Sequence, residues 1–120
     1  MRHESDAHIA RAAELAIACH KQADMAVPWP AAARVIGFDL AGPEAGGPAS
    51  RHAALLARVR TAGLGLTLHA GEADGGERVL QAVRLGAQRI GHGVCLADLI
   101  ADLIGDLKAD GPAAAPCWPS

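Results

Sequence analysis

The sequence predicts an α/β fold in which short strands alternate with helices around a parallel sheet. Short apolar runs and longer segments of helical periodicity follow one another with a period of roughly 25 to 30 residues, as in successive βα units. These units share no sequence with one another, which argues against a solenoid. Three apolar runs end near a polar residue, namely Asp39, His69 and His92. Because parallel strands present their carboxyl ends at one edge, we expect these residues on the same face.

The first element expected is a helix that begins at Ser5 and Asp6, since Ser5 provides a capping oxygen and Asp6 an acid in the first turn. Its apolar positions recur at helical spacing as far as about Lys21, and they are Ile9, Ala13, Ala16 and Ile17. The segment Pro28–Pro30 interrupts this pattern. Residues 35–40 then form a short, mostly apolar run, which predicts a strand with both faces covered.

A loop rich in glycine and proline, Pro43–Ser50, connects this strand to a helix expected over Arg51–Ala62. The apolar face of that helix consists of Leu55, Leu56 and Val59. Gly63 is a typical C-terminal stop. The next strand is expected over Leu64–His69, because leucines at every second position alternate with smaller or polar residues.

Asp74 and Glu77 have the spacing of a capping pair for the helix that follows. We expect this helix to continue through the apolar residues Val79, Leu80 and Val83 to Gly86. Another short strand, Gln88–Gly93, ends near His92.

Asp98 is expected to cap a last helix, which ends at Gly111 and Pro112. Its apolar stripe consists of Leu99, Ile100, Leu103, Ile104 and Leu107. The final segment, residues 113–120, carries little information and could begin one more strand.

Size and composition set limits on the function. With 120 residues the chain is one domain or part of one. A net charge of −2 without a basic stripe argues against a nucleic-acid partner. No apolar run reaches the roughly 18 residues of a membrane span, and the first residues lack the apolar core of a secretory signal. The three cysteines are widely spaced without a CxxC pair, so we expect reduced thiols in a cytoplasmic protein.

The run His69-Ala70-Gly71-Glu72 combines residues that can carry chemistry. A neutral imidazole at a strand end is a good zinc ligand. The small residues let the backbone turn and leave space for a ligand. A carboxyl group three residues later can act on that ligand as a general acid or base. The alternative interpretation is a polar strand end followed by a solvated loop.

Three motifs together resemble the adenosine deaminase family: Gly37–Glu44 (GFDLAGPE), Leu68–Glu72 (LHAGE) and Arg89–Gly93 (RIGHG). Their order and separation are similar to those of the family. Related adenine deaminases usually carry Asp at the position of Gly91 and a different string after Asp39, so the resemblance favours the nucleoside enzyme.

This resemblance implies an incomplete (β/α)8 TIM barrel with one zinc ion. It implies zinc-dependent hydrolytic deamination of adenosine or deoxyadenosine, a small-molecule purine nucleoside, to inosine or deoxyinosine plus ammonia. His69 would be a zinc ligand, Glu72 would protonate the purine ring, and His92 would orient and help deprotonate the attacking water. Gly42 would offer its backbone N–H to the purine. Asp39 and Glu44 would orient these groups without touching the substrate themselves, or would anchor the loops.

Two motifs of the family are missing from the chain: a His-x-His pair on the first barrel strand and an Asp-Asp pair on the last. A complete barrel needs about 250 residues. Residues 1–120 are therefore expected to form a partial barrel domain, roughly its central βα units, that does not hold zinc stoichiometrically by itself. The alternatives are an inactive fragment, a module that completes a barrel with another chain through its exposed edges, and a related purine deaminase.

Overall fold

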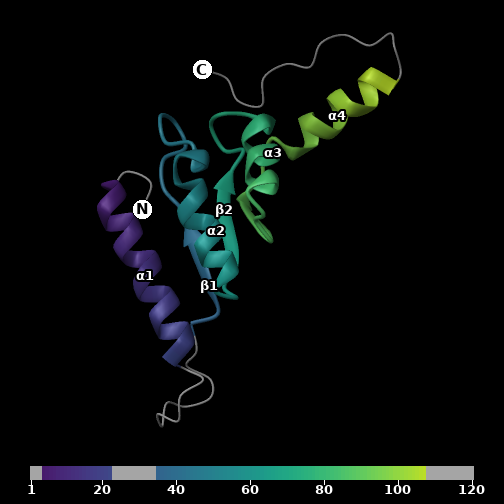
Figure 1. The fold of residues 1–120 in the computed structure, drawn as a ribbon. Coiled ribbons are helices and arrows are strands. Elements are labelled where there is room, and N and C mark those ends of the chain that lie inside the picture. The colour runs from purple at the N-terminus through teal and green to yellow at the C-terminus, as the bar shows by residue number, and fades with distance from the viewer. Residues whose placement is uncertain (1–3, 23–34, 108–120) are drawn as a thin grey trace.

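The computed structural model describes residues 4–22 and 35–107 of the chain, and within them helices and strands alternate as predicted (Figure 1). The elements are α1 (Asp6–Gln22), β1 (Gly37–Leu40), the 3-10 helix η1 (Ala49–His52), α2 (Ala53–Thr61), β2 (Gly65–Ala70), α3 (Gly76–Arg84), β3 (Arg89–His92) and α4 (Leu96–Leu107). The fold is α/β, and its consecutive parallel units are compatible with part of a (β/α)8 barrel.

The sheet has three parallel strands in the order β1-β2-β3. Gly37 pairs with Gly65 in one ladder, and His69 pairs with Gly91 in the other. One face of the sheet is buried, through Phe38 and Leu40 of β1 together with Leu66, Leu68 and Ala70 of β2. Asp39 and His69 belong to the opposite face.

The prediction that β1 is covered on both faces is wrong for the described part of the chain. Gly37 and Asp39 are exposed, whereas Phe38 and Leu40 are buried. Covering the second face would require side chains from other strands curving over it, as in a closed barrel.

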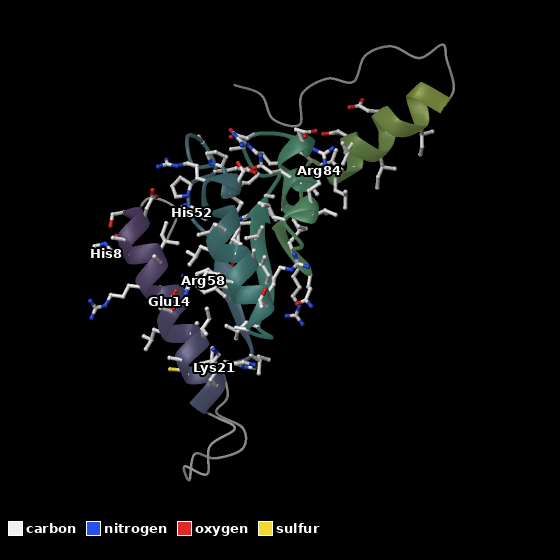
Figure 2. All side chains as sticks on the ribbon, viewed as in Figure 1. His8, Glu14, Lys21, His52, Arg58 and Arg84 are labelled. Atoms are coloured by element: carbon white, nitrogen blue, oxygen red, sulfur yellow. The ribbon has the colours of Figure 1, made fainter. Side chains whose placement is uncertain are left out.

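Helices α1, α2 and α3 contribute the core that covers the buried face. The apolar positions predicted for α1 at Ile9, Ala13 and Ile17 are buried, and α2 adds Leu56 and Val59. Each fully buried Ile, Leu or Val side chain contributes about 1.5–3 kcal/mol to the stability of the fold. Figure 2 shows Arg58 of α2 directed toward Glu14 of α1, with 2.6 Å between Arg58 Nη2 and Glu14 Oε1. Because both side chains are largely exposed, this pair stabilises the contact by at most about 1 kcal/mol.

The helix ends largely follow their sequence signals. Ser5 caps α1, since its Oγ accepts the His8 N–H at 3.3 Å. Gly63 stops α2 with a φ of 90°, and Leu64 N–H donates to Val59 O at 3.3 Å, as in a Schellman motif. Gly86 ends α3 in the same way, with Ala87 N–H bonded to Ala82 O at 3.1 Å.

Two predicted caps are wrong. The N-cap of α3 is Gly75, without a side-chain cap, because the Asp74 carboxylate instead binds Arg78, with 2.7 Å between Oδ2 and Nη2. Helix α4 begins at Leu96, so Asp98 lies in its first turn and is not the cap.

Other boundaries differ by a few residues or lie beyond the described chain. A 3-10 turn from Ala49 precedes α2, which was expected to begin at Arg51. The expected break at Pro28–Pro30, the stop at Gly111 and the segment 113–120 lie outside the described residues.

Candidate active site

The carboxyl ends of the three strands place Asp39, His69, Glu72 and His92 at one edge of the sheet. Asp39 pairs in register with Thr67, two residues before His69 on the same face of β2. His92 is the last residue of β3, and Glu72 lies two residues beyond the end of β2. The parallel register therefore brings together residues that are 53 positions apart in the sequence, from Asp39 to His92.

The four side chains form a continuous series of contacts. His69 Nε2 lies 3.2 Å from Asp39 Oδ2. The His69 and His92 rings meet edge to face, with 4.9 Å between their centroids. His92 Nε2 lies 3.3 Å from Glu72 Oε2. Both imidazoles keep access to solvent, with 28% and 38% of the side chain exposed, so a small molecule can reach them.

Gly91 makes room for the His69 ring. It is the β3 partner of His69, and a Cβ atom at this position would lie 2.6 Å from His69 Cδ2 and 2.8 Å from His69 Nε2. Because real Cβ atoms do not approach so closely, any other residue would displace the ring from Asp39 and His92. Sequence reasoning did not assign Gly91 to the site, although a glycine inside a strand is a known signal of close approach.

His92 adopts a left-handed backbone conformation, with a φ of 63°. A regular strand would direct it to the same side as its ladder partner Ala70, which is buried. Its ring is instead exposed beside His69. Non-glycine residues in this conformation are strained by about 1–3 kcal/mol and concentrate at functional sites.

Glu44 holds the loop that follows β2. Its side chain is buried, and its carboxylate accepts the backbone N–H groups of Gly71, Glu72, Ala73 and Asp74 at 2.8 to 3.2 Å. Burial raises the pKa of Glu44, but the four N–H donors outweigh it, so the pKa is lowered below its ordinary value of 4.5.

Gly42 also lies at this end of the sheet, and Asp39 has a closer role than the sequence predicts. Gly42, with a φ of 122°, is half-buried in the loop between Asp39 and Glu44. Asp39, expected only to support or anchor, contacts the His69 imidazole directly.

Imidazole nitrogens and carboxylate oxygens are donors that zinc accepts, so the chemistry of the site suits that metal. Among residues 4–22 and 35–107, however, no three His, Cys, Asp or Glu side chains are grouped as a metal site would require. The described residues thus offer donors of the kind that zinc accepts but do not by themselves make up a zinc site. In the same residues no helix is both long and apolar enough to cross a bilayer.

Comparison with known proteins agrees with the sequence motifs. The family model for adenosine deaminase matches residues 2–113. The adenosine deaminase of Erwinia tasmaniensis is 54% identical over 61 residues, which are 50% of this chain and 18% of that protein. The adenosine deaminases of Vibrio parahaemolyticus and Vibrio cholerae are 52% and 54% identical over segments of the same length and coverage. The matching segment spans about a fifth of the length of these curated relatives.

Proposed function

Because the chain belongs to the adenosine deaminase family, we propose that its strand ends form the central part of a zinc-dependent adenosine deaminase active site. The reaction is the hydrolysis of adenosine or deoxyadenosine, in which water replaces the 6-amino group and ammonia leaves. The observation that carries this proposal is the convergence of Asp39, His69, Glu72 and His92 at the carboxyl edge of one parallel sheet.

His69 is proposed as the zinc ligand that this chain contributes. Its Nε2 lies 3.2 Å from Asp39 Oδ2, within hydrogen-bond distance, and a neutral imidazole nitrogen held in this way can bind a metal ion. When bound, zinc would lower the pKa of a coordinated water to about 7 and so supply a nucleophile at neutral pH. The described residues alone do not complete the three or four ligands of a zinc centre.

Glu72 and His92 are proposed as the acid–base pair. Their side chains lie 3.3 Å apart, so they can share one proton. Glu72 would deliver a proton to the purine ring nitrogen beside the attacked carbon, while His92 would orient the attacking water and accept its proton. Gly42 would bind the purine through its backbone N–H, since its loop begins at the carboxyl end of β1.

We propose a cytoplasmic enzyme of purine salvage. The described cysteines, Cys19 and Cys95, are free thiols, which supports a reducing compartment such as the cytoplasm. Deamination of free purine nucleosides belongs to purine salvage.

A second candidate is a module that completes a barrel with another chain, or with further copies of itself. Its support is that β1 and β3 are the edges of the described sheet and that α4 exposes Leu96, Ile100 and Ile104, which are 44–50% exposed. In Figure 1, α4 extends away from the sheet. Size-exclusion chromatography distinguishes the possibilities, because a defined oligomer supports assembly and aggregation supports an inactive fragment.

The test of the proposed reaction is a graft. Residues 37–93 of this chain, which hold the three motifs, replace the corresponding segment of the Vibrio cholerae adenosine deaminase, and ammonia release is measured with adenosine, deoxyadenosine and other purines. We expect activity with the nucleosides, and a loss of about 100-fold or more in Glu72→Gln and His92→Ala grafts. Glu77→Gln, an exposed carboxylate on α3, is the matched control and should leave the rate unchanged.

An inactive graft that folds and binds zinc would refute the proposed roles. A graft that prefers another purine would favour the related-deaminase alternative. For the isolated chain, metal analysis and ammonia release are expected to show neither stoichiometric zinc nor turnover. Tight 1:1 zinc with turnover would contradict the assignment as a partial barrel.

A further inference from the structure

Glu44 is the one buried charged side chain in the part of the chain that the structure describes, with 4% of its surface exposed. Its two carboxylate oxygens accept hydrogen bonds from different residues of the loop after β2. Oε1 accepts the Gly71 N–H at 2.8 Å, and Oε2 accepts those of Glu72, Ala73 and Asp74 at 3.0, 2.9 and 3.2 Å. Four consecutive N–H groups can point at one carboxylate only if the loop curves around it.

The same loop is tied to the segment that follows β3. Gly71 O accepts the Cys95 N–H at 3.1 Å, and Ala70 O accepts the Gly93 N–H at 2.9 Å. Gly71 is therefore bonded on both sides, to Glu44 through its N–H and to Cys95 through its C=O. His92 is the last residue of the β3 ladder and directly precedes Gly93, so these two hydrogen bonds hold the chain just after it.

From these contacts we infer that Glu44 is a positioning residue that fixes Glu72 and His92 together, by holding the β2–α3 loop to which both are attached. The inference rests on the proposed function for the roles of Glu72 and His92. Glu44 does not touch the reacting groups with its own side chain in the described contacts. It acts by linking the segments that follow all three strands into one hydrogen-bonded unit.

A carboxylate suits this role better than an amide of the same shape. A Gln at position 44 has one acceptor oxygen, and its NH2 group would face backbone N–H donors. The single amide oxygen could accept either from the Gly71 N–H or from the N–H groups of Glu72, Ala73 and Asp74, but not from both sets. The backbone N–H groups left without an acceptor would then destabilise the β2–α3 loop more than the rest of the fold.

Amide hydrogen exchange in the 120-residue chain tests the inference without substrate. In the wild-type chain we expect the amides of residues 71–74 to be protected about 100-fold or more over an unstructured peptide. In Glu44→Gln we expect this protection to fall about tenfold or more, with a parallel fall at Gly93 and Cys95 and no change in α1. Glu77→Gln, which removes an exposed carboxylate nearby, should change none of these amides.

The same variant in the Vibrio cholerae graft gives a catalytic readout. We expect kcat to fall about tenfold or more while KM changes less than about threefold, because misplaced reacting groups affect the transition state more than ground-state binding. If the unmodified graft is inactive, the proposed function fails, whereas the exchange result still decides the positioning.

Three results would overturn the inference: unprotected amides at 71–74 in the wild-type chain, unchanged protection in Glu44→Gln, or, in a Glu44→Gln chain that still folds, a loss of equal size in α1 and at 71–74. If Glu44→Gln does not fold, Glu44→Asp replaces it, since it keeps the charge but is one methylene shorter. Protection that survives in α1 but is partly lost at 71–74 then supports the role. Loss spread evenly over both segments contradicts it.

Discussion

Replacing Gly91 by alanine should displace the His69 ring. The new Cβ would lie 2.6 Å from His69 Cδ2 and 2.7 Å from His69 Cγ, whereas ordinary contacts lie at 3.4–4 Å. The ring must therefore move by about 1 Å, which breaks its 3.2 Å contact with Asp39 and its edge-to-face contact with His92. Gly91 has no left-handed backbone, so alanine at this position adds no backbone strain to the clash with the ring.

The magnitude follows from the exposure of the ring. Overpacking in a closed core costs about 1–3 kcal/mol, and because the His69 side chain is 28% exposed it can swing outward, which keeps the value near 1–2 kcal/mol. The gain from reducing the freedom of the unfolded chain, about 0.4–1 kcal/mol, offsets part of this. In a His69→Ala background the clash is absent, so Gly91→Ala should be neutral or slightly stabilising there.

Urea unfolding of the four chains of this double-mutant cycle measures the coupling between the two positions. We expect a coupling energy of about 1–2 kcal/mol. Equal effects of Gly91→Ala with and without the His69 ring would refute the reasoning, because they would show that the ring does not lie against Gly91.

Three other substitutions have defined expected outcomes. His92→Gly should be more stable than His92→Ala by about 1 kcal/mol in urea unfolding, because only glycine relieves the φ of 63°; equal stabilities would show that the backbone is unstrained. Because its pKa is lowered, the charged form of Glu44 stabilises the fold above the ordinary value of 4.5, and this contribution is lost as the pH falls through the folded pKa. The wild-type chain should therefore exceed Glu44→Gln by about 2–3 kcal/mol at pH 7, and the difference should shrink in urea titrations below pH 4.5; a constant difference would contradict this. Ile100→Lys should lower the apparent mass in sedimentation equilibrium if the exposed face of α4 drives self-association, whereas Ala101→Lys, also exposed on α4, serves as the control and should not.

The sequence was sufficient to predict that polar residues gather at one edge of the sheet, because this arrangement depends on periodicity and parallel order. Alternating leucines located β2, and polar residues after consecutive apolar runs indicated one chemical edge. The structure does bring His69, Glu72 and His92 to that edge. Gly63 and Gly86 ended their helices as expected, since the Schellman motif is local in sequence.

The features that the sequence could not predict depend on tertiary contacts. Glu44 could be named as a loop anchor, but its four donors are backbone groups without a residue signature. Asp74 has the spacing of a capping residue, yet its backbone N–H donates to Glu44 and its carboxylate accepts from Arg78. The role of Gly91 becomes visible only when the register of β3 against β2 places it opposite His69.

The central claim is that the imidazoles of His69 and His92 lie against each other at the carboxyl edge of the sheet, beside Glu72. Ring-proton nuclear Overhauser effects in the 120-residue chain test it most directly, with resonances assigned by His69→Ala and His92→Ala. With 4.9 Å between the ring centroids, we predict a cross-peak between the two rings that disappears in either variant. A well-folded chain without this cross-peak would contradict the account.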